Sequence, residues 1–256
     1  MLKIKTYFTQ IRRFSISKLV LLLIVLAISC SEEPRNAKHR ALQAHQKPVI
    51  DGLANDSCWE NATWYPIDQL WLGREYSKDD FEGRYKLAWT NEKLYLLAQI
   101  VDDTLIDIHA DSFDQYWDDD CLEIFLDEDH SGGKHQFSHN AFAYHIALDG
   151  KVVDFSPAQK PAFYNEHLQV KRTQNGKIST WEVEISLYDD HYQDGKDNKA
   201  VALFESKKIG FAIAYCDNDF SAERENFIGS VRVDGQDKNQ GYLNASIFGT
   251  LILAKE

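Results

Sequence analysis

Apolar and polar side chains alternate with a period of two along most of the chain after residue 80. In one such run Trp181, Val183 and Ile185 alternate with Glu182 and Glu184. Successive side chains of a β-strand point to opposite faces, so this period indicates strands, each with an apolar and a wet face. Similar runs cover residues 84–89, 94–101, 121–127, 209–216 and 248–253.

Turn sequences separate these runs, and helix signals are few and short. The turn residues 90–93 join two runs as a hairpin, and Asp-Gly or Asn-Gly pairs at 149–150, 175–176 and 234–235 mark further turns. Strands punctuated by turns over about 200 residues predict a single all-β domain. We therefore expect an antiparallel β-sandwich, immunoglobulin-like or jelly-roll-like, with few short helices, over residues 48–256.

The N-terminus has the layout of an exported lipoprotein. Basic residues precede the apolar run Leu19–Ile28, which is too short to cross a bilayer and suits a signal peptide. The run ends in Ala27-Ile28-Ser29-Cys30, which resembles the bacterial lipobox. We expect residues 1–29 to be removed and Cys30 to be lipidated, so that the lipid is the only membrane attachment.

Residues 30–47 lack periodicity and are interpreted as the lipidated cysteine and a flexible tether. Acidic residues follow Cys30 directly, which resembles a signal for the outer face of the outer membrane. The expected location is therefore the outer membrane, on the cell surface rather than the periplasmic face.

Charge and cysteine content limit the partners. The chain has 40 acidic and 28 basic residues, a formal charge of −12. The charged residues of the predicted signal are all basic, so its loss makes the remaining chain more negative. Such a field repels nucleic acid and favours neutral ligands or cations. Three cysteines remain after Cys30, at positions 58, 121 and 216, and an odd number gives no disulfide framework.

Three stretches together resemble the family 9 carbohydrate-binding modules and related DOMON-like sandwiches. The opening stretch contains Ile50-Asp51-Gly52 and Cys58-Trp59-Glu60-Asn61-Ala62, and the closing one contains Asp217-Asn218-Asp219. The most specific stretch is Tyr116-Trp117-Asp118-Asp119-Asp120-Cys121-Leu122-Glu123-Ile124-Phe125-Leu126-Asp127. The resemblance covers residues 48–254 and implies a sandwich that binds oligosaccharides or polysaccharides, in some members at a reducing end.

This resemblance, together with the chemistry of sugars, suggests site residues. Aromatic rings cover the C–H face of a sugar, and charged or amide groups pair with its hydroxyls. The family's matching positions imply sugar contacts from Trp117, Glu123 and Asn218. No tryptophan follows Trp181, so Phe220 or Phe227 is the candidate second ring, and Tyr144 or His145 would replace the family's basic contact.

Metal and cofactor expectations are modest. Some family members carry structural calcium, and Asp118, Asp119, Asp127 and Asp129 supply the hard oxygen ligands that calcium prefers. The histidines lack a zinc spacing signature. Met1, the only methionine, is lost with the signal, which excludes methionine-ligated haem. We expect no required cofactor.

The expected function is non-catalytic carbohydrate binding by a membrane-anchored lipoprotein that supports glycan capture, in a glycan-uptake complex, or carbohydrate catabolism. No sequence spacing selects the pair of carboxylates that a glycosidase needs, and no nucleophile motif is present. Two alternatives stay open: a structural or assembly lipoprotein that contacts other proteins, and an accessory of a glycoside hydrolase system with hydrolase activity.

Overall fold

The computed structural model describes residues 38–255 of the 256-residue chain. The predicted signal peptide, the predicted lipidation site Cys30 and residues 31–37 of the predicted tether lie outside this range. Among the described residues, no helix is long and apolar enough to cross a membrane.

Strands make up most of the described structure, as the period-two pattern predicts, and the only helices within residues 38–255 are two short 3-10 turns. The turns are η1 (Ser57–Trp59) and η2 (Ala245–Ile247). The strands are β1 (Lys38–Gln43), β2 (Tyr65–Ile67), β3 (Gln69–Leu72), β4 (Phe81–Trp89), β5 (Leu94–Asp102), β6 (Cys121–Asp127), β7 (Phe142–Ala147), β8 (Val152–Phe155), β9 (Pro161–Phe163), β10 (Leu168–Asn175), β11 (Ile178–Ile185), β12 (Lys208–Asp217), β13 (Asn226–Gly229) and β14 (Gly249–Ala254).

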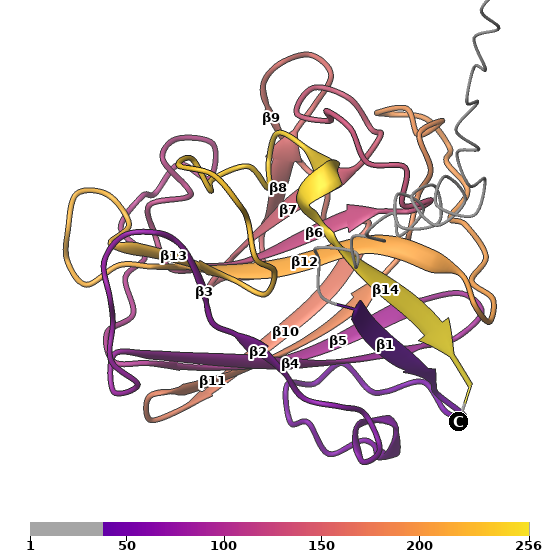
Figure 1. The fold of residues 1–256 in the computed structure, drawn as a ribbon, viewed down its shortest axis with the longest axis horizontal. Coiled ribbons are helices and arrows are strands. Elements are labelled where there is room, and N and C mark those ends of the chain that lie inside the picture. Colours follow the sequence, from indigo (N-terminus) through magenta and orange to yellow (C-terminus); the bar gives the residue numbers. More distant parts are fainter. Residues whose placement is uncertain (1–37, 256) are drawn as a thin grey trace, which may run out of the picture. The chain divides into compact units, whose positions relative to one another are not determined.

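The strands are hydrogen-bonded into one sheet that curls into two facing layers (Figure 1). One layer has the order β10-β11-β5-β4, with β2 beside β4. The other has the order β14-β12-β6-β7-β8-β9, and β13 and β3 extend it from β12. Strand β1 connects the layers because it pairs with β4 on one side and with β14 on the other.

Strand β1 corrects two predictions. Both of its pairings are parallel, so the sheet is mixed rather than purely antiparallel. It also occupies Lys38–Gln43, which the sequence placed in the tether, so the domain begins before residue 48. The strand was hard to recognise because its inward-facing residues, His39 and Ala41, are weakly apolar and alternate with basic ones.

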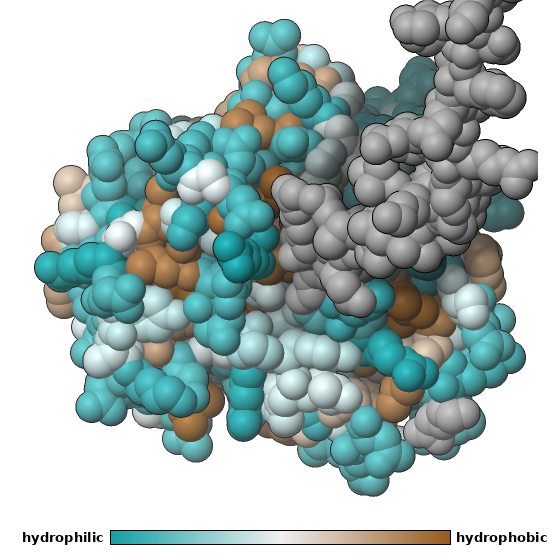
Figure 2. Space-filling model, in the orientation of Figure 1, coloured by the Kyte–Doolittle hydropathy of each residue, from teal (hydrophilic) through white to brown (hydrophobic). Residues whose placement is uncertain are grey.

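The main core fills the space between the layers. Alternate residues of β12, among them Ile209, Phe211 and Ile213, pack there against Trp89 of β4 and Trp181 of β11. On the face shown in Figure 2, hydrophilic residues predominate and apolar side chains appear only in separate groups. The residues of β11 and β12 that lie in this core are those that the period-two pattern assigns to the apolar face, so the pattern correctly predicts which face of each strand enters it.

The other strand faces are drier than predicted. Glu182 of β11, expected in water, is fully buried. Its carboxylate accepts hydrogen bonds from the Gly52 amide at 2.8 Å, the Asp51 amide at 3.1 Å and the Trp59 indole at 3.0 Å. The segment before β2 thus covers the outer face of this layer, and Glu182 satisfies the polar groups that are buried there.

Replacing Glu182 by alanine should destabilise the domain by about 3 kcal/mol, because two buried donors and one partly buried donor lose their acceptor. Glu184→Ala is the matched control, two residues along the same strand face. Its contact with Lys93 is 3.6 Å long, and its loss should cost less than about 1 kcal/mol. Urea unfolding of both variants measures the difference, and equal losses would contradict the role assigned to Glu182.

Candidate functional site

A cavity of about 340 Å³ lies on the outer face of β6 and β7. Glu123 and His145 form its floor as register partners on these two antiparallel strands. Their neighbours Leu122 and Tyr144 point the other way, into the main core. The remaining lining comes from β7, from β8 and from loops: Ala143, Tyr116, Trp117, Gln136, Asp154, Phe155, Arg224, Asn239 and Tyr242.

Glu123 is the polar centre of the floor. Its Oε1 lies 3.6 Å from Arg224 Nη1 and 3.7 Å from His145 Nδ1, and the Cys216 thiol donates to it at 3.3 Å. Burial alone would raise the pKa of Glu123, but the contacts with His145, Arg224 and Cys216 outweigh burial and lower it. The carboxylate therefore stays ionised and can accept hydrogen bonds from a ligand's hydroxyls.

The charges of the cavity nearly balance. Arg224 stacks on Phe227, with its guanidinium carbon 4.2 Å from the ring centroid, and provides the cation beside Glu123. Burial raises the pKa of Asp154 well above its usual value, which favours the uncharged acid. A nearly neutral cavity with strong hydrogen-bonding groups suits a polar, uncharged ligand.

Aromatic rings form part of the wall. Trp117 is 38% exposed and meets Tyr116 edge-on, with ring centroids 4.9 Å apart. Tyr116 in turn meets His145 edge-on at 4.7 Å. Tyr242, also 38% exposed, lines the same cavity from the loop before η2. Two half-exposed rings therefore reach one polar cavity.

The structure separates the residues that the sequence proposed for sugar contact. Trp117, Glu123 and His145 line the cavity. Tyr144 does not: it points into the main core, and its hydroxyl group pairs with His167 Nδ1 at 2.8 Å. The alternation of β7 excludes Tyr144 from the cavity because it places neighbouring residues on opposite faces.

Asn218 and Phe220 also lie elsewhere. The Asn218 side chain is fully buried, donates to the Asp118 carbonyl at 2.6 Å and accepts from the Ser221 amide at 2.8 Å. It shapes the loops beside the cavity and is not among the residues that line it. Phe220 is 80% exposed at a backbone φ of 74° and does not line the cavity either.

Arg224 and Tyr242 are among the cavity residues that the sequence did not predict. Each lies in a loop without periodicity, and Arg224 stands between two glutamates as an ordinary surface charge would. The only available signal was indirect. The loop after β12 leaves from the same end of the β6–β12 pair at which Trp117 enters, since the two strands are antiparallel.

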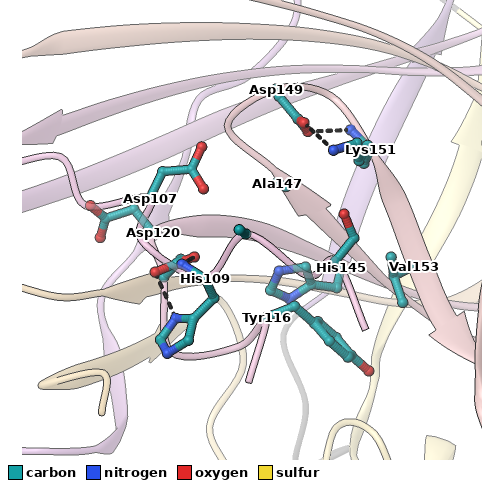
Figure 3. Close-up of a pocket in the computed structure, with 12 residues that line it drawn as sticks. Asp107, His109, Tyr116, Asp120, His145, Ala147, Asp149, Lys151 and Val153 are labelled. Carbon is teal, nitrogen blue, oxygen red and sulfur yellow. Dashed lines mark hydrogen bonds and ion pairs between the residues drawn. The ribbon is translucent and has the colours of Figure 1, made fainter. Parts of the chain in front are cut away.

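A second cavity of about 220 Å³ shares His145 and Tyr116 with the first (Figure 3). Most of its charges are paired within the protein. Lys151 contacts Asp149 at 2.8 Å, and His109 Nδ1 lies 2.9 Å from a carboxylate oxygen of Asp119. These four side chains are therefore already paired with one another within the protein.

The four carboxylates predicted to bind calcium do not come together. Within residues 38–255, none belongs to a group of three or more ligating side chains. Each accepts a hydrogen bond from a backbone amide instead: Asp127, for example, accepts from the Gly132 amide at 2.7 Å. The others, which likewise accept from nearby backbone amides, are Asp118, Asp119 and Asp129.

A different carboxylate cluster lies at one end of the sheet. Asp102 ends β5, Asp120 precedes β6 and Asp217 ends β12, and their oxygens lie within 4.8 Å of one another. All three are buried, and burial raises the pKa values of Asp102, Asp120 and Asp217 to about 6, 9 and 8. Repulsion by the Asp102 carboxylate adds to this increase at Asp120 and Asp217. The Asp217 carboxylate makes no hydrogen bond to the described residues, whereas Asp102 accepts from the Tyr215 hydroxyl and Asp120 accepts from the Ile106 and Asn218 amides.

A β-sandwich with half-exposed aromatic rings around an ionised carboxylate and an arginine has the features of a carbohydrate-binding module. The sequence agrees with this class. The family model described as "Carbohydrate family 9 binding domain-like" matches residues 50–256. The chain therefore belongs to carbohydrate-binding module family 9, and its function is non-catalytic carbohydrate binding. Family membership confirms the predicted function class and the expectation that the chain is not an enzyme.

Solved structures show the same fold. The chain is similar to a family 9 module from Caldicellulosiruptor kristjanssonii in complex with cellotriose, with 19% identity, a TM-score of 0.64 and coverage of 86% of this chain and 95% of that one. It is also similar to a family 9 module from the same organism in complex with glucose, with 19% identity, a TM-score of 0.63 and coverage of 86% of this chain and 97% of that one. A third similar structure is a putative carbohydrate-binding protein from Bacteroides uniformis, with 11% identity, a TM-score of 0.56 and coverage of 85% of this chain and 99% of that one. No curated protein sequence matches the chain significantly.

Proposed function

We propose that the cavity on β6 and β7 binds a neutral oligosaccharide or the end of a polysaccharide. The observation that carries the proposal is the buried, ionised Glu123 at the base of a cavity that Trp117 and Tyr242 also line. The balanced charges of the cavity favour a neutral sugar, and the net charge of −12 disfavours acidic polysaccharides. Similarity to structures holding cellotriose and glucose supports the same class of ligand.

In the proposed complex the floor and the wall have different tasks. Glu123 accepts from sugar hydroxyls, Arg224 donates to them, and His145 has a buried Nε2 without a hydrogen-bond partner among the described residues. Trp117 and Tyr242 lie against the C–H faces of the sugar. Tyr242, rather than the exposed Phe220, thus serves as the second ring.

Trp117→Ala and Tyr242→Ala should each weaken sugar binding by about tenfold or more, because each removes one apolar contact surface. Titration calorimetry against a panel of neutral oligosaccharides, including cellotriose and glucose, measures this effect. The intrinsic fluorescence of the wild-type protein should also change on binding, since Trp117 is half exposed beside the cavity.

Phe220→Ala is the control for these variants. It removes a more exposed ring, 80% accessible, that does not line the cavity, so the affinity should stay within about twofold of wild type. A loss with Phe220→Ala but not with Tyr242→Ala would show that the second ring has been misassigned. No binding by the wild type across the panel would refute the proposed ligand class.

As a second proposal, the buried carboxylate cluster at the end of the sheet binds a structural calcium ion. Asp102, Asp120 and Asp217 supply hard oxygen ligands, and the side-chain carboxylate of Asp217 has no hydrogen-bond partner among the described residues. A cation there would neutralise three buried carboxylates that link the ends of β5 and β12 with the chain just before β6.

Calcium should therefore stabilise the domain, by about 2.7 kcal/mol when the free ion exceeds its Kd about 100-fold. Thermal unfolding with added calcium and with EDTA measures the shift. Asp217→Asn should abolish the shift, whereas Asp129→Asn, in a turn away from the cluster, should retain it. If Asp129→Asn abolishes the shift and Asp217→Asn retains it, the calcium site lies at the loop carboxylates and not at the cluster.

For its cellular location, we propose that the chain is a lipoprotein anchored at Cys30 in the outer membrane, on the cell surface, where it supports glycan capture. The support is the signal-like N-terminus and the acidic residues after Cys30. Cys30→Ala should move the protein from the membrane fraction to the soluble fraction, and Cys58→Ala should not. Surface proteolysis of intact cells then identifies the membrane face. Membrane retention of Cys30→Ala would contradict the proposed anchor.

A further inference from the structure

The floor of the cavity gathers three side chains that can ligate a soft or borderline metal ion. The ligand atoms of Cys121, Glu123 and His145 all lie within 4.8 Å of one another. Cys121 Sγ is 3.2 Å from His145 Nδ1, which is 3.7 Å from Glu123 Oε1. All three residues are at least nine-tenths buried. This group is separate from the all-carboxylate cluster of Asp102, Asp120 and Asp217.

Sheet geometry places these ligands together. Cys121 and Glu123 are two residues apart on β6 and therefore point to the same face. His145 on β7 is the register partner of Glu123. Both strands are central in their layer, with β12 on one side and β8 on the other. The three ligands are thus held by paired backbone, which reduces the entropy lost when a metal binds.

The donor set and its spacing match zinc. Thiolate, imidazole and carboxylate are its usual protein ligands, with bonds of about 2.0–2.3 Å. In a tetrahedron with such bonds, neighbouring ligand atoms lie about 3.3–3.8 Å apart. The measured separations of 3.2 Å and 3.7 Å lie close to that range. A three-ligand set leaves a fourth position for water or another oxygen ligand.

Arg224, the other charged group beside the floor, does not occupy the side chains of Cys121 and His145. Arg224 Nη1 is 3.0 Å from Cys216 Sγ and 3.6 Å from Glu123 Oε1. Within residues 38–255 it makes no hydrogen bond to either Cys121 or His145. The arginine therefore engages the second cysteine, Cys216, which faces Cys121 across the β6–β12 pair.

We propose that Cys121, Glu123 and His145 bind one Zn²⁺ at the floor of the cavity. Binding replaces the thiol proton of Cys121, which passes to the buffer, and forms the zinc–thiolate bond without any change of oxidation state. The site goes beyond the proposed sugar function, although it shares Glu123 and His145 with it. No spacing in the sequence indicates this site, because its ligands come from two strands and lack a zinc-type motif.

Cobalt titration of the reduced, chelator-treated and desalted protein, without sugar, tests the proposal. Tetrahedral Co²⁺ should give visible absorption and a thiolate charge-transfer band that saturate at one ion per chain, and Zn²⁺ should displace both. Cys121→Ser should weaken the metal affinity about tenfold or more and remove the charge-transfer band. Absence of the band in the wild type, or its persistence in Cys121→Ser, would overturn the proposal.

Two matched variants keep the test specific. Cys216→Ser changes the facing buried cysteine and should leave the charge-transfer band in place, and loss of the band would overturn the three-ligand assignment. Trp117→Ala should retain the metal affinity while its sugar affinity falls about tenfold or more. Failure of the sugar proposal is therefore distinguishable from failure of this one. Thermal unfolding checks that each variant folds, and Cys121→Ala replaces Cys121→Ser if the serine variant does not.

Discussion

The pairing of β6 with β12 is the constraint on which the rest of the structure depends. Seven register pairs, from Gly210–Asp127 to Cys216–Cys121, join these strands. One face of the pair supplies Ile124, Ile213 and neighbouring residues to the main core. The other face packs under a smaller cluster that includes Phe125 and Phe248. Because both faces are buried, the pair can hold a carboxylate at a fixed position while loops at its ends vary.

That rigid pair explains how an ionised glutamate exists in an interior position. Glu123 would be costly to bury alone. Arg224, Cys216 and His145 reach it from three separate segments and supply the charge and hydrogen bonds that water would otherwise provide. The same contacts fix its orientation, so a ligand meets a preorganised acceptor and not a mobile surface side chain.

The sequence predicted well those features that depend on alternation. The β-rich fold, the core faces of β11 and β12, and the direction of Glu123 away from the main core follow from a period of two. The pattern could not show that Glu182 is covered, since burial of that face depends on a segment more than 100 residues away. It also missed β1, whose inward residues are only His39 and Ala41.

Loop-borne parts of the candidate site escaped prediction for a related reason. Arg224 and Tyr242 acquire their meaning only from the strands that their loops connect, and no local pattern distinguishes them from surface residues. Phe220 is the aromatic residue nearest to Asn218 after it in the sequence, but its ring is 80% exposed and does not line the cavity. Proximity along the chain was therefore a poor guide to proximity in the cavity.

The parallel pairing of β1 with β14 and β4 also has a mechanical consequence. Tension that enters through the residues before Lys38 and is resisted by the body of the domain pulls along the axis of β1. The hydrogen bonds on both of its edges then carry the load together, in shear, rather than opening one after another as in a zipper. A domain held from its N-terminal side while it grips a polymer would thus be loaded in its more resistant direction.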